Sequence, residues 1–227
     1  FNKTPRYELF PVSRYYDNRL DPALVSWMKP FDKAVDKVMH DEIGKSDAAM
    51  ENGTIGPLTN WVADMVYELG SRMTNKKVDL AIINKGGVRQ PMPKGNVSRG
   101  LMETMLPFTN RILLMEIDGK SLQEGFDVMA QRGGDAISRQ ANAGMRNGKA
   151  VNVTINGQPL DPDRTYLIAT IDYLAEGGDN MASFTRGKVI VRSHRLLKED
   201  AISFVKDLTA AGKSIPSDPT ERMHKEK

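Results

Sequence analysis

The sequence contains no cysteine and only three histidines in 227 residues. The lack of cysteine excludes a disulfide framework and thiolate-bound metals, and it leaves the cellular compartment open. His40, His194 and His224 lie far apart, and none has a second ligand at the spacing of a metal site. We therefore expect neither a metal nor any other cofactor to be held by this chain alone.

Long apolar runs, a signal peptide and a basic stripe are missing as well. No stretch approaches the roughly 18 apolar residues of a membrane helix, so we expect no transmembrane segment. The net charge is only +3, and lysine and arginine are interleaved with acidic residues, which argues against a nucleic-acid partner. The sequence starts at Phe1 rather than at methionine, and we expect that an export signal has been removed.

Motifs of common reaction centres are also absent. The chain has no G-x-S-x-G nucleophile elbow and no G-x-x-x-x-G-K-[ST] phosphate loop. A catalytic pair of carboxylates cannot be singled out among 29 acidic residues. The residues by themselves offer no recognisable reaction centre, and they direct attention to binding groups instead.

What the sequence does contain is a buried-strand pattern, at Val78 to Arg89, that is followed by a sharp turn. The first six residues, V-D-L-A-I-I, are mostly apolar, which favours a strand buried on both faces. Asn84, the pair Gly86-Gly87 and then Arg89 follow it. Two interpretations fit: a polar rim that binds a ligand, or a tight strand exit with a solvated arginine. The second is the more common outcome for short glycine motifs.

Residues at other turns widen the set of candidate binding groups. Asn84 carries a donor and an acceptor, Asp179 can accept from two sugar hydroxyls, and Arg89 can grip a phosphate. Phe108 follows a proline, and Tyr173 precedes a second Gly-Gly turn. The alternatives stay open, because aromatic residues after turns are commonly core and Asp179 in G-G-D-N fits an Asx turn.

Hydrophobic periodicity predicts interspersed helices and strands in one domain of the α+β or mixed α/β class. We expect a lead-in at 1–20, a domain at 21–212 and a solvated polar tail at 213–227. The expected helices are 21–42, with Pro30 bending it, and 57–74, 98–105, 121–130 and 196–210. The expected strands are 78–83, 111–117, 151–155, 166–170 and 188–192, with loops at 43–56 and 132–148.

Four motifs in order resemble the C-terminal domain of the 5′-nucleotidase family, which includes ecto-5′-nucleotidases and periplasmic UDP-sugar hydrolases. They are N-K-G-G-V-R at 84–89, L-P-F at 106–108, I-D-G-K-S-L at 117–122 and Y-L-A-E-G-G-D-N at 173–180. The ordered match runs from about Asp21 to Ala211. The resemblance implies an α+β fold with layered helices and mixed β-sheets.

The resemblance also implies a role for each candidate residue, within a site that binds a nucleotide or nucleoside. A base would lie between two rings, with an amide at its edge, a carboxylate on the ribose hydroxyls and a cation on the phosphate side. In that order these groups are Phe108 and Tyr173, Asn84, Asp179 and Arg89, while Gly87 would line the site.

Two departures from the family pattern bear on activity. The family's N-terminal metallophosphoesterase domain, with its pair of divalent metals, has no counterpart here. The segment Glu51 to Asp64 also lacks an arginine that the family usually carries, which removes one cation from the phosphate side. We therefore expect a substrate-recognition domain for nucleotide catabolism, exported to the periplasm or cell envelope, whose hydrolytic partner is a metallophosphoesterase domain or chain.

Two other interpretations remain at this point. The chain can be a non-catalytic module of the envelope that binds a ligand or partner and has kept the fold. It can also be one part of a longer fusion. In either case, we do not expect hydrolysis by this chain alone.

Overall fold

The computed structural model describes residues 20–226, which form two units, one ending at Met39 and one starting at His40. The first unit contains helix α1 (Pro22–Met39), which confirms the helix predicted from Asp21. The Asp21 carboxylate accepts from the backbone N–H of Ala23 at 2.8 Å and so caps the helix. Pro30 lies inside the helix, and no residue of α1 is buried. The predicted lead-in falls outside the described residues except for Leu20.

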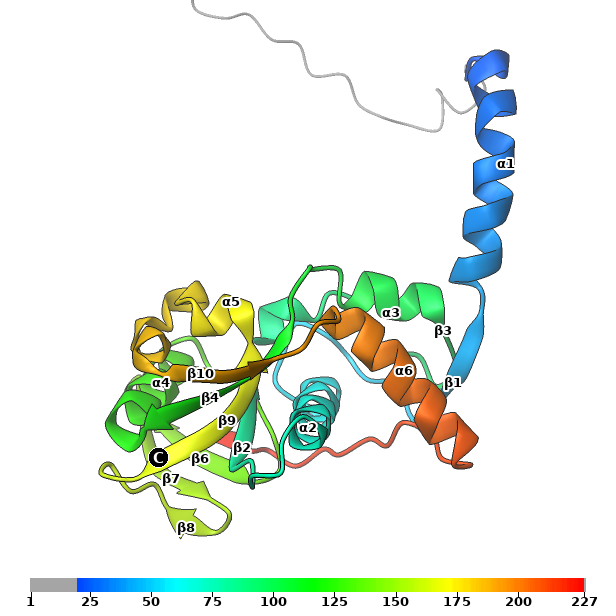
Figure 1. The fold of residues 1–227 in the computed structure, drawn as a ribbon. Helices are drawn as coiled ribbons and strands as arrows, with labels where there is room; N and C mark the ends of the chain where they lie inside the picture. The colour runs from blue at the N-terminus through cyan, green and yellow to red at the C-terminus, as the bar shows by residue number, and fades with distance from the viewer. Residues whose placement is uncertain (1–19, 227) are drawn as a thin grey trace, which may run out of the picture. The chain divides into compact units, whose positions relative to one another are not determined.

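A mixed five-stranded sheet forms the centre of the second unit (Figure 1). Its order is β10 (Lys188–Arg192), β4 (Ile112–Asp118), β9 (Thr165–Ile171), β2 (Leu80–Ile83) and β5 (Ala136–Ile137). Strand β2 runs parallel to β9, and the other pairings are antiparallel. All four residues of β2 are buried, which confirms the prediction of a strand covered on both faces.

Helices and smaller sheets complete the layers around this sheet, and the predicted class, α+β with mixed sheets, is confirmed. Helix α2 (Pro57–Arg72) packs against β2, β5 and β9, and α6 (Leu197–Ala210) packs against α3 (Arg99–Met105). The remaining elements are α4 (Gly119–Gln131) and α5 (Asp172–Ala175), a pair of strands β1 (Glu42–Ser46) and β3 (Gly95–Ser98), and a sheet ordered β11 (Met223–Lys225), β6 (Ala141–Arg146), β7 (Lys149–Ile155), β8 (Gln158–Pro159).

The prediction of long loops at 43–56 and 132–148 is wrong in part. Residues 42–46 form β1, and the segment 132–148 contributes β5 and β6. Their glycine, asparagine and arginine residues conceal the strand pattern. The backbone pairing to β3, β2 and β7 nevertheless holds them in extended conformation, and small side chains such as Ala143 are buried.

The expectation of a solvated C-terminal tail is wrong for residues 222–225. Arg222 is only 4% exposed and donates to the Asp64 carboxylate at 2.8 and 2.7 Å and to Asp218 at 2.7 Å. Strand β11 pairs in parallel with β6, and Met223 is buried. The mixed charges of this segment suggested a solvated end. Instead, Arg222 forms ion pairs with Asp218 and with Asp64 of α2, and these ion pairs attach the segment to that helix.

The carboxyl group of Asp218 makes folding stability depend on pH. Hydrogen bonds from Thr220 and Arg222 lower its pKa from 3.8 to about 2. Its contribution is therefore complete above about pH 4 and is lost as the pH falls toward 2. Because the side chain is 42% exposed, we expect less than about 1 kcal/mol. Urea unfolding at pH 5 and pH 2.5 should show a smaller excess stability of wild type over Asp218→Asn at pH 2.5 than at pH 5. An equal difference in stability at the two pH values would contradict this assignment.

Candidate functional site

The predicted residues meet where neighbouring strands end. Strands β2 and β9 are parallel neighbours, so their carboxyl ends lie at the same edge of the sheet. Asn84 follows β2 and leads into a one-turn helix, η2 (Lys85–Gly87). Tyr173 lies on α5, directly after β9. Phe108 lies in the connection between α3 and β4.

A hollow of about 300 Å³ lies at this edge. Its lining consists of Asn84, Gly86, Arg89, Phe108, Asn110, Tyr173 and Asp179. Five of the six predicted site residues therefore share one hollow, and the rings of Phe108 and Tyr173 are each 43% exposed. Gly87 does not line this hollow; it is buried, and a Cβ added there would lie 3.0 Å from Asn84 Oδ1. The structure brings these residues together, and their roles in binding stay a prediction.

The carboxylate of Asp179 links both sides of the hollow. Its Oδ1 accepts from the Tyr173 hydroxyl at 2.9 Å, and its Oδ2 accepts from Asn84 Nδ2 at 2.9 Å. The backbone N–H of Asp179 donates back to the Tyr173 hydroxyl at 3.2 Å. The hydrogen bond to Asp179 also raises the pKa of Tyr173. One acceptor position on each carboxylate oxygen is left for a ligand hydroxyl.

Asn84 brings an unused acceptor to the same place. Its Oδ1 is buried and has no hydrogen-bond partner within residues 20–226. A buried acceptor without a partner costs about 1–3 kcal/mol. A ligand that donates to this oxygen, as an amino group on a heterocycle does, would recover that cost.

Arg89 supplies a positive charge at the rim. Its Cζ lies 5.4 Å from the centroid of the Phe108 ring. The side chain is exposed, and none of the ion pairs among the described residues includes it. Its guanidinium thus stays available for an anionic group of a ligand bound beside Phe108.

The sequence analysis did not identify Arg132, whose guanidinium donates a hydrogen bond to the backbone of Asp179. Arg132 donates to the backbone carbonyl of Asp179 at 2.6 Å and, through Nε, to Asp135 at 2.7 Å. Asp135 is buried, which raises its pKa, while the backbone N–H of Lys85 and the charge of Arg132 oppose this rise. The sequence offered one indication of this contact: Arg132 and Asp135 flank Gly133-Gly134. That segment was expected to be a loop.

Gly178 is a second missed residue, and it offers a test of the geometry. A Cβ added there would lie 2.6 Å from Cε2 of Tyr173 and 2.5 Å from its carbonyl oxygen. We expect Gly178→Ala to displace the ring and to weaken ligand binding by about 5-fold or more, since a ring contact with a base is worth roughly 1–3 kcal/mol. Gly56→Ala is the matched control, because no heavy atom lies within 4 Å of its new Cβ and Gly56 does not line the hollow. Equal affinity of the two variants in calorimetry would show that Tyr173 is not positioned this way.

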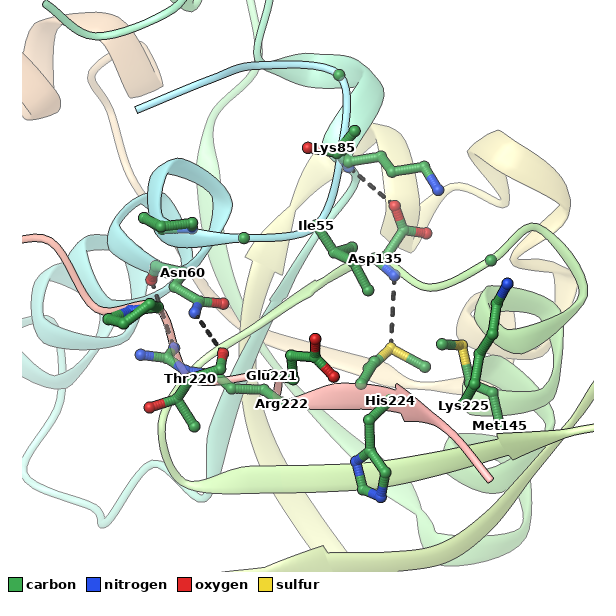
Figure 2. A pocket seen from close by; sticks show the side chains of 17 residues that line it. Ile55, Asn60, Lys85, Asp135, Met145, Thr220, Glu221, Arg222, His224 and Lys225 are labelled. Atoms are coloured by element: carbon green, nitrogen blue, oxygen red, sulfur yellow. Dashed lines mark hydrogen bonds between the residues drawn. The ribbon is translucent and has the colours of Figure 1, made fainter. Parts of the chain in front are cut away.

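A larger hollow, of about 660 Å³, lies next to the site (Figure 2). Figure 2 shows Lys85 and Asp135 on one side of it and Asn60 and Thr220 on another. The amino group of Lys85 already donates to the carbonyls of Arg132 and Gly134, both at 2.9 Å. No phenylalanine, tyrosine or tryptophan is among its lining residues. The smaller hollow is therefore the better candidate for a flat heterocycle.

Neither a cluster of metal ligands nor a membrane-spanning helix is found within residues 20–226. In that part of the chain, no group of three or more histidine, aspartate or glutamate side chains is placed to hold a metal ion. No helix in residues 20–226 is both long and apolar enough to cross a membrane.

Comparison with protein families gives a match over residues 37–186, to the family described as 5′-nucleotidase, C-terminal domain. The protein UshA of Yersinia enterocolitica is 27% identical over 70% of this chain and 30% of its own length. A 5′-nucleotidase of Vibrio vulnificus is 29% identical over 73% of this chain and 31% of its own length. The chain thus spans about a third of the length of these curated relatives.

Solved structures show the same fold. A 5′-nucleotidase precursor from Thermus thermophilus aligns with a TM-score of 0.74 at 21% identity, over 89% of this chain and 42% of its own. The NAD nucleotidase of Haemophilus influenzae aligns with a TM-score of 0.65 at 22% identity, over 91% of this chain and 42% of its own.

Proposed function

The chain belongs to the 5′-nucleotidase C-terminal domain family, and on this premise we propose that it is the nucleotide-recognition part of a 5′-nucleotidase-type phosphoester hydrolase. It binds a nucleotide or nucleoside, and a separate metal-bearing domain or chain hydrolyses the phosphoester as a step in nucleotide catabolism. Its site of action is the periplasm or cell envelope, after export.

The observation that carries this proposal is the hollow shared by Asn84, Phe108, Tyr173 and Asp179. Two half-exposed rings at one hollow provide a stacking platform, which contributes roughly 1–3 kcal/mol per base. The free Oδ1 of Asn84 takes a donor from the base edge, and the open acceptor positions of Asp179 take the ribose hydroxyls.

The phosphate side is the weaker half of the site. Arg89 is the cation at the rim, and the segment 51–64 contributes no second arginine. A charge-assisted hydrogen bond contributes about 1.5–3 kcal/mol, so its loss weakens the hold on phosphate while leaving base recognition intact. The site holds the base and sugar and leaves the phosphoester extending outward.

Hydrolysis belongs to a partner in this proposal. The chain covers only 30% of the length of UshA and 31% of the length of the Vibrio nucleotidase. The described residues hold no metal-ligand cluster, so they do not fit a metal pair. A metallophosphoesterase domain or chain supplies the metals, which polarise phosphate and activate water.

The test is reconstitution of turnover. The purified chain is mixed with a purified metallophosphoesterase domain of a 5′-nucleotidase, and phosphate release from AMP and from UDP-glucose is measured at several ratios. We expect turnover to rise with the amount of this chain. No gain at any ratio would contradict the proposal, as would strong phosphate release by this chain without the partner.

A non-catalytic envelope module is the alternative, and calorimetry separates it from the proposed function. Adenosine, AMP and UDP-glucose are titrated into the wild-type chain. Heat of binding for at least the nucleoside supports the recognition domain. The absence of binding for all three ligands supports the alternative.

A further inference from the structure

Asp135 is a buried carboxylate that lies outside the smaller hollow, and no step of the proposed function uses it. Its side chain is 2% exposed. Strand β5 pairs antiparallel with β2 so that Ala136 lies opposite Ile83, which places Asp135 opposite Asn84. Burial of a charge destabilises a protein unless the charge is paired and hydrogen-bonded. The groups that Asp135 binds therefore indicate what its burial provides.

The Asp135 carboxylate joins two segments of the site. Its Oδ1 accepts from the backbone N–H of Lys85, the residue after Asn84, at 2.8 Å, and Figure 2 shows this hydrogen bond as a dashed line. Its Oδ2 accepts from Nε of Arg132 at 2.7 Å. Arg132 in turn donates through Nη1 to the backbone carbonyl of Asp179 at 2.6 Å. One carboxylate thus connects the turn that carries Asn84 with the turn that carries Asp179.

The turn between Arg132 and Asp135 has a backbone conformation that favours glycine. Gly133 and Gly134 have φ angles of 79° and 92°. This reversal follows the end of α4 and brings the guanidinium of Arg132 onto Asp135, three residues later. The backbone N–H of Asp135 also donates to the sulfur of Met223 at 3.4 Å. The ion pair therefore lies in a segment that is held at both ends.

Asp179 depends on support from its neighbours because its backbone lies in the left-handed region. Its φ is 53° and its ψ is 34°, a conformation that residues other than glycine keep where the surrounding structure holds them. The Tyr173 hydroxyl accepts from the Asp179 N–H at 3.2 Å, and Arg132 donates to its carbonyl. Nη1 of Arg132 also lies 3.7 Å from Oδ2 of Asp179. The direction of this carboxylate thus depends on both contacts.

We propose that Asp135 is a positioning residue of the nucleoside site, which acts through Arg132 to direct the Asp179 carboxylate at the ribose hydroxyls. The inference rests on the proposed function, and it adds a residue that lies outside the hollow. Without the charge of Asp135, the guanidinium of Arg132 loses the partner that sets its direction, and Asp179 loses its support on that side. Ring stacking and the Asn84 contact do not pass through Arg132, so recognition of the base is retained.

The variant Asp135→Asn interrupts this connection selectively. The amide oxygen of asparagine still accepts from the Lys85 N–H, whereas its amide nitrogen is a donor and cannot bind the guanidinium. We expect adenosine to bind about 10-fold more weakly, while the affinity for 2′,3′-dideoxyadenosine, which lacks both ribose hydroxyls, changes by less than about 2-fold. Calorimetry of the full chain with both nucleosides measures the two changes. Equal weakening for both nucleosides, or an unchanged affinity for adenosine, would overturn the proposal.

The matched control is Asp79→Asn, at the opposite end of β2. Asp79 is also buried, and its carboxylate accepts from the backbone N–H of Leu167 at 2.9 Å and from Arg164 at 2.5 Å. Neither Asp79 nor Arg164 lines the hollow. We expect this variant to lose stability as Asp135→Asn does, and to bind both nucleosides like wild type. A selective loss of adenosine binding in Asp79→Asn would show that the effect follows from lower stability, and it would contradict the proposal.

The variant Arg132→Met tests the same connection at its other member. The Arg132 side chain is 28% exposed, so this variant should fold even if Asp135→Asn does not. It should weaken adenosine selectively, and adding Asp135→Asn to it should cause little further loss, because both changes act on one contact. Loss of both nucleosides alike in Arg132→Met would overturn the proposal. Losses that multiply in the double variant would do so as well, because Asp135 would then act by a separate route.

The wild-type titrations separate this inference from the proposed function. Wild type should bind adenosine more tightly than 2′,3′-dideoxyadenosine. If wild type binds neither nucleoside, the proposed function fails and this inference fails with it. If wild type binds adenosine and the variants weaken both nucleosides equally, the proposed function stands and Asp135 has no positioning role.

Discussion

Replacing Phe108 by alanine is expected to weaken the binding of adenosine and AMP by the same factor, about 5- to 150-fold. The ring is 43% exposed and lines the hollow, so it is free to stack on a base. Loss of one stacking contact costs roughly 1–3 kcal/mol, and this loss does not depend on whether the ligand carries a phosphate. Calorimetry of both ligands with the same protein preparation measures the two factors.

The control for Phe108→Ala is a check that the variant remains folded. Because the Phe108 ring is outside the core, the melting temperature should stay close to that of wild type. Tyr173→Ala should reproduce the loss on the other side of the hollow. Unchanged affinity in Phe108→Ala, with the fold intact, would show that no base stacks on this ring.

Replacing Arg89 by alanine is expected to weaken AMP binding by about 12- to 150-fold and to change adenosine binding far less. The guanidinium lies at the rim beside Phe108, and no carboxylate among the described residues pairs with it. A charged hydrogen bond to phosphate contributes about 1.5–3 kcal/mol to AMP binding. Adenosine has no phosphate, so its binding does not include this contribution. The ratio of the two affinities, measured by calorimetry in one buffer, is the quantity to compare.

Arg72→Ala is the matched control for Arg89→Ala. Arg72 is also an exposed arginine beside a ring, with Cζ 5.3 Å from the centroid of Phe204, and it does not line the hollow. Its replacement should leave both affinities unchanged. If Arg89→Ala weakens adenosine and AMP equally, the cation does not face the phosphate.

The sequence was sufficient to predict the strand and the turns that carry the site residues, because each depends on residues that are neighbours in the chain. A run of apolar residues that ends in Asn84 and two glycines predicts a buried strand with a sharp exit, and β2 and η2 confirm it. Proline before Phe108 and Gly-Gly after Tyr173 likewise indicate turns, and both rings are exposed there. Strand β2 pairs with β9, which brings these distant turns to one edge of the sheet.

Contacts between distant segments could not be predicted in this way. Strands β5, β6 and β11 have little pattern of their own, and pairing with other strands holds them extended. The hydrogen bonds that join Asp179 to Asn84 and Arg132 span 95 and 47 residues. A single sequence contains no signal for such pairs, because each partner is an ordinary polar residue until the fold brings them together.

Mapping of the adenosine-binding surface by NMR tests the central claim most directly. In spectra of the ¹⁵N-labelled chain, adenosine should shift the side-chain amide of Asn84 and the backbone amides of Gly86, Phe108 and Asp179, which surround the smaller hollow. Signals from Thr220 and Lys225, which line the larger hollow, should stay in place. Shifts confined to the larger hollow, or no shifts at a millimolar concentration of adenosine, would contradict the account.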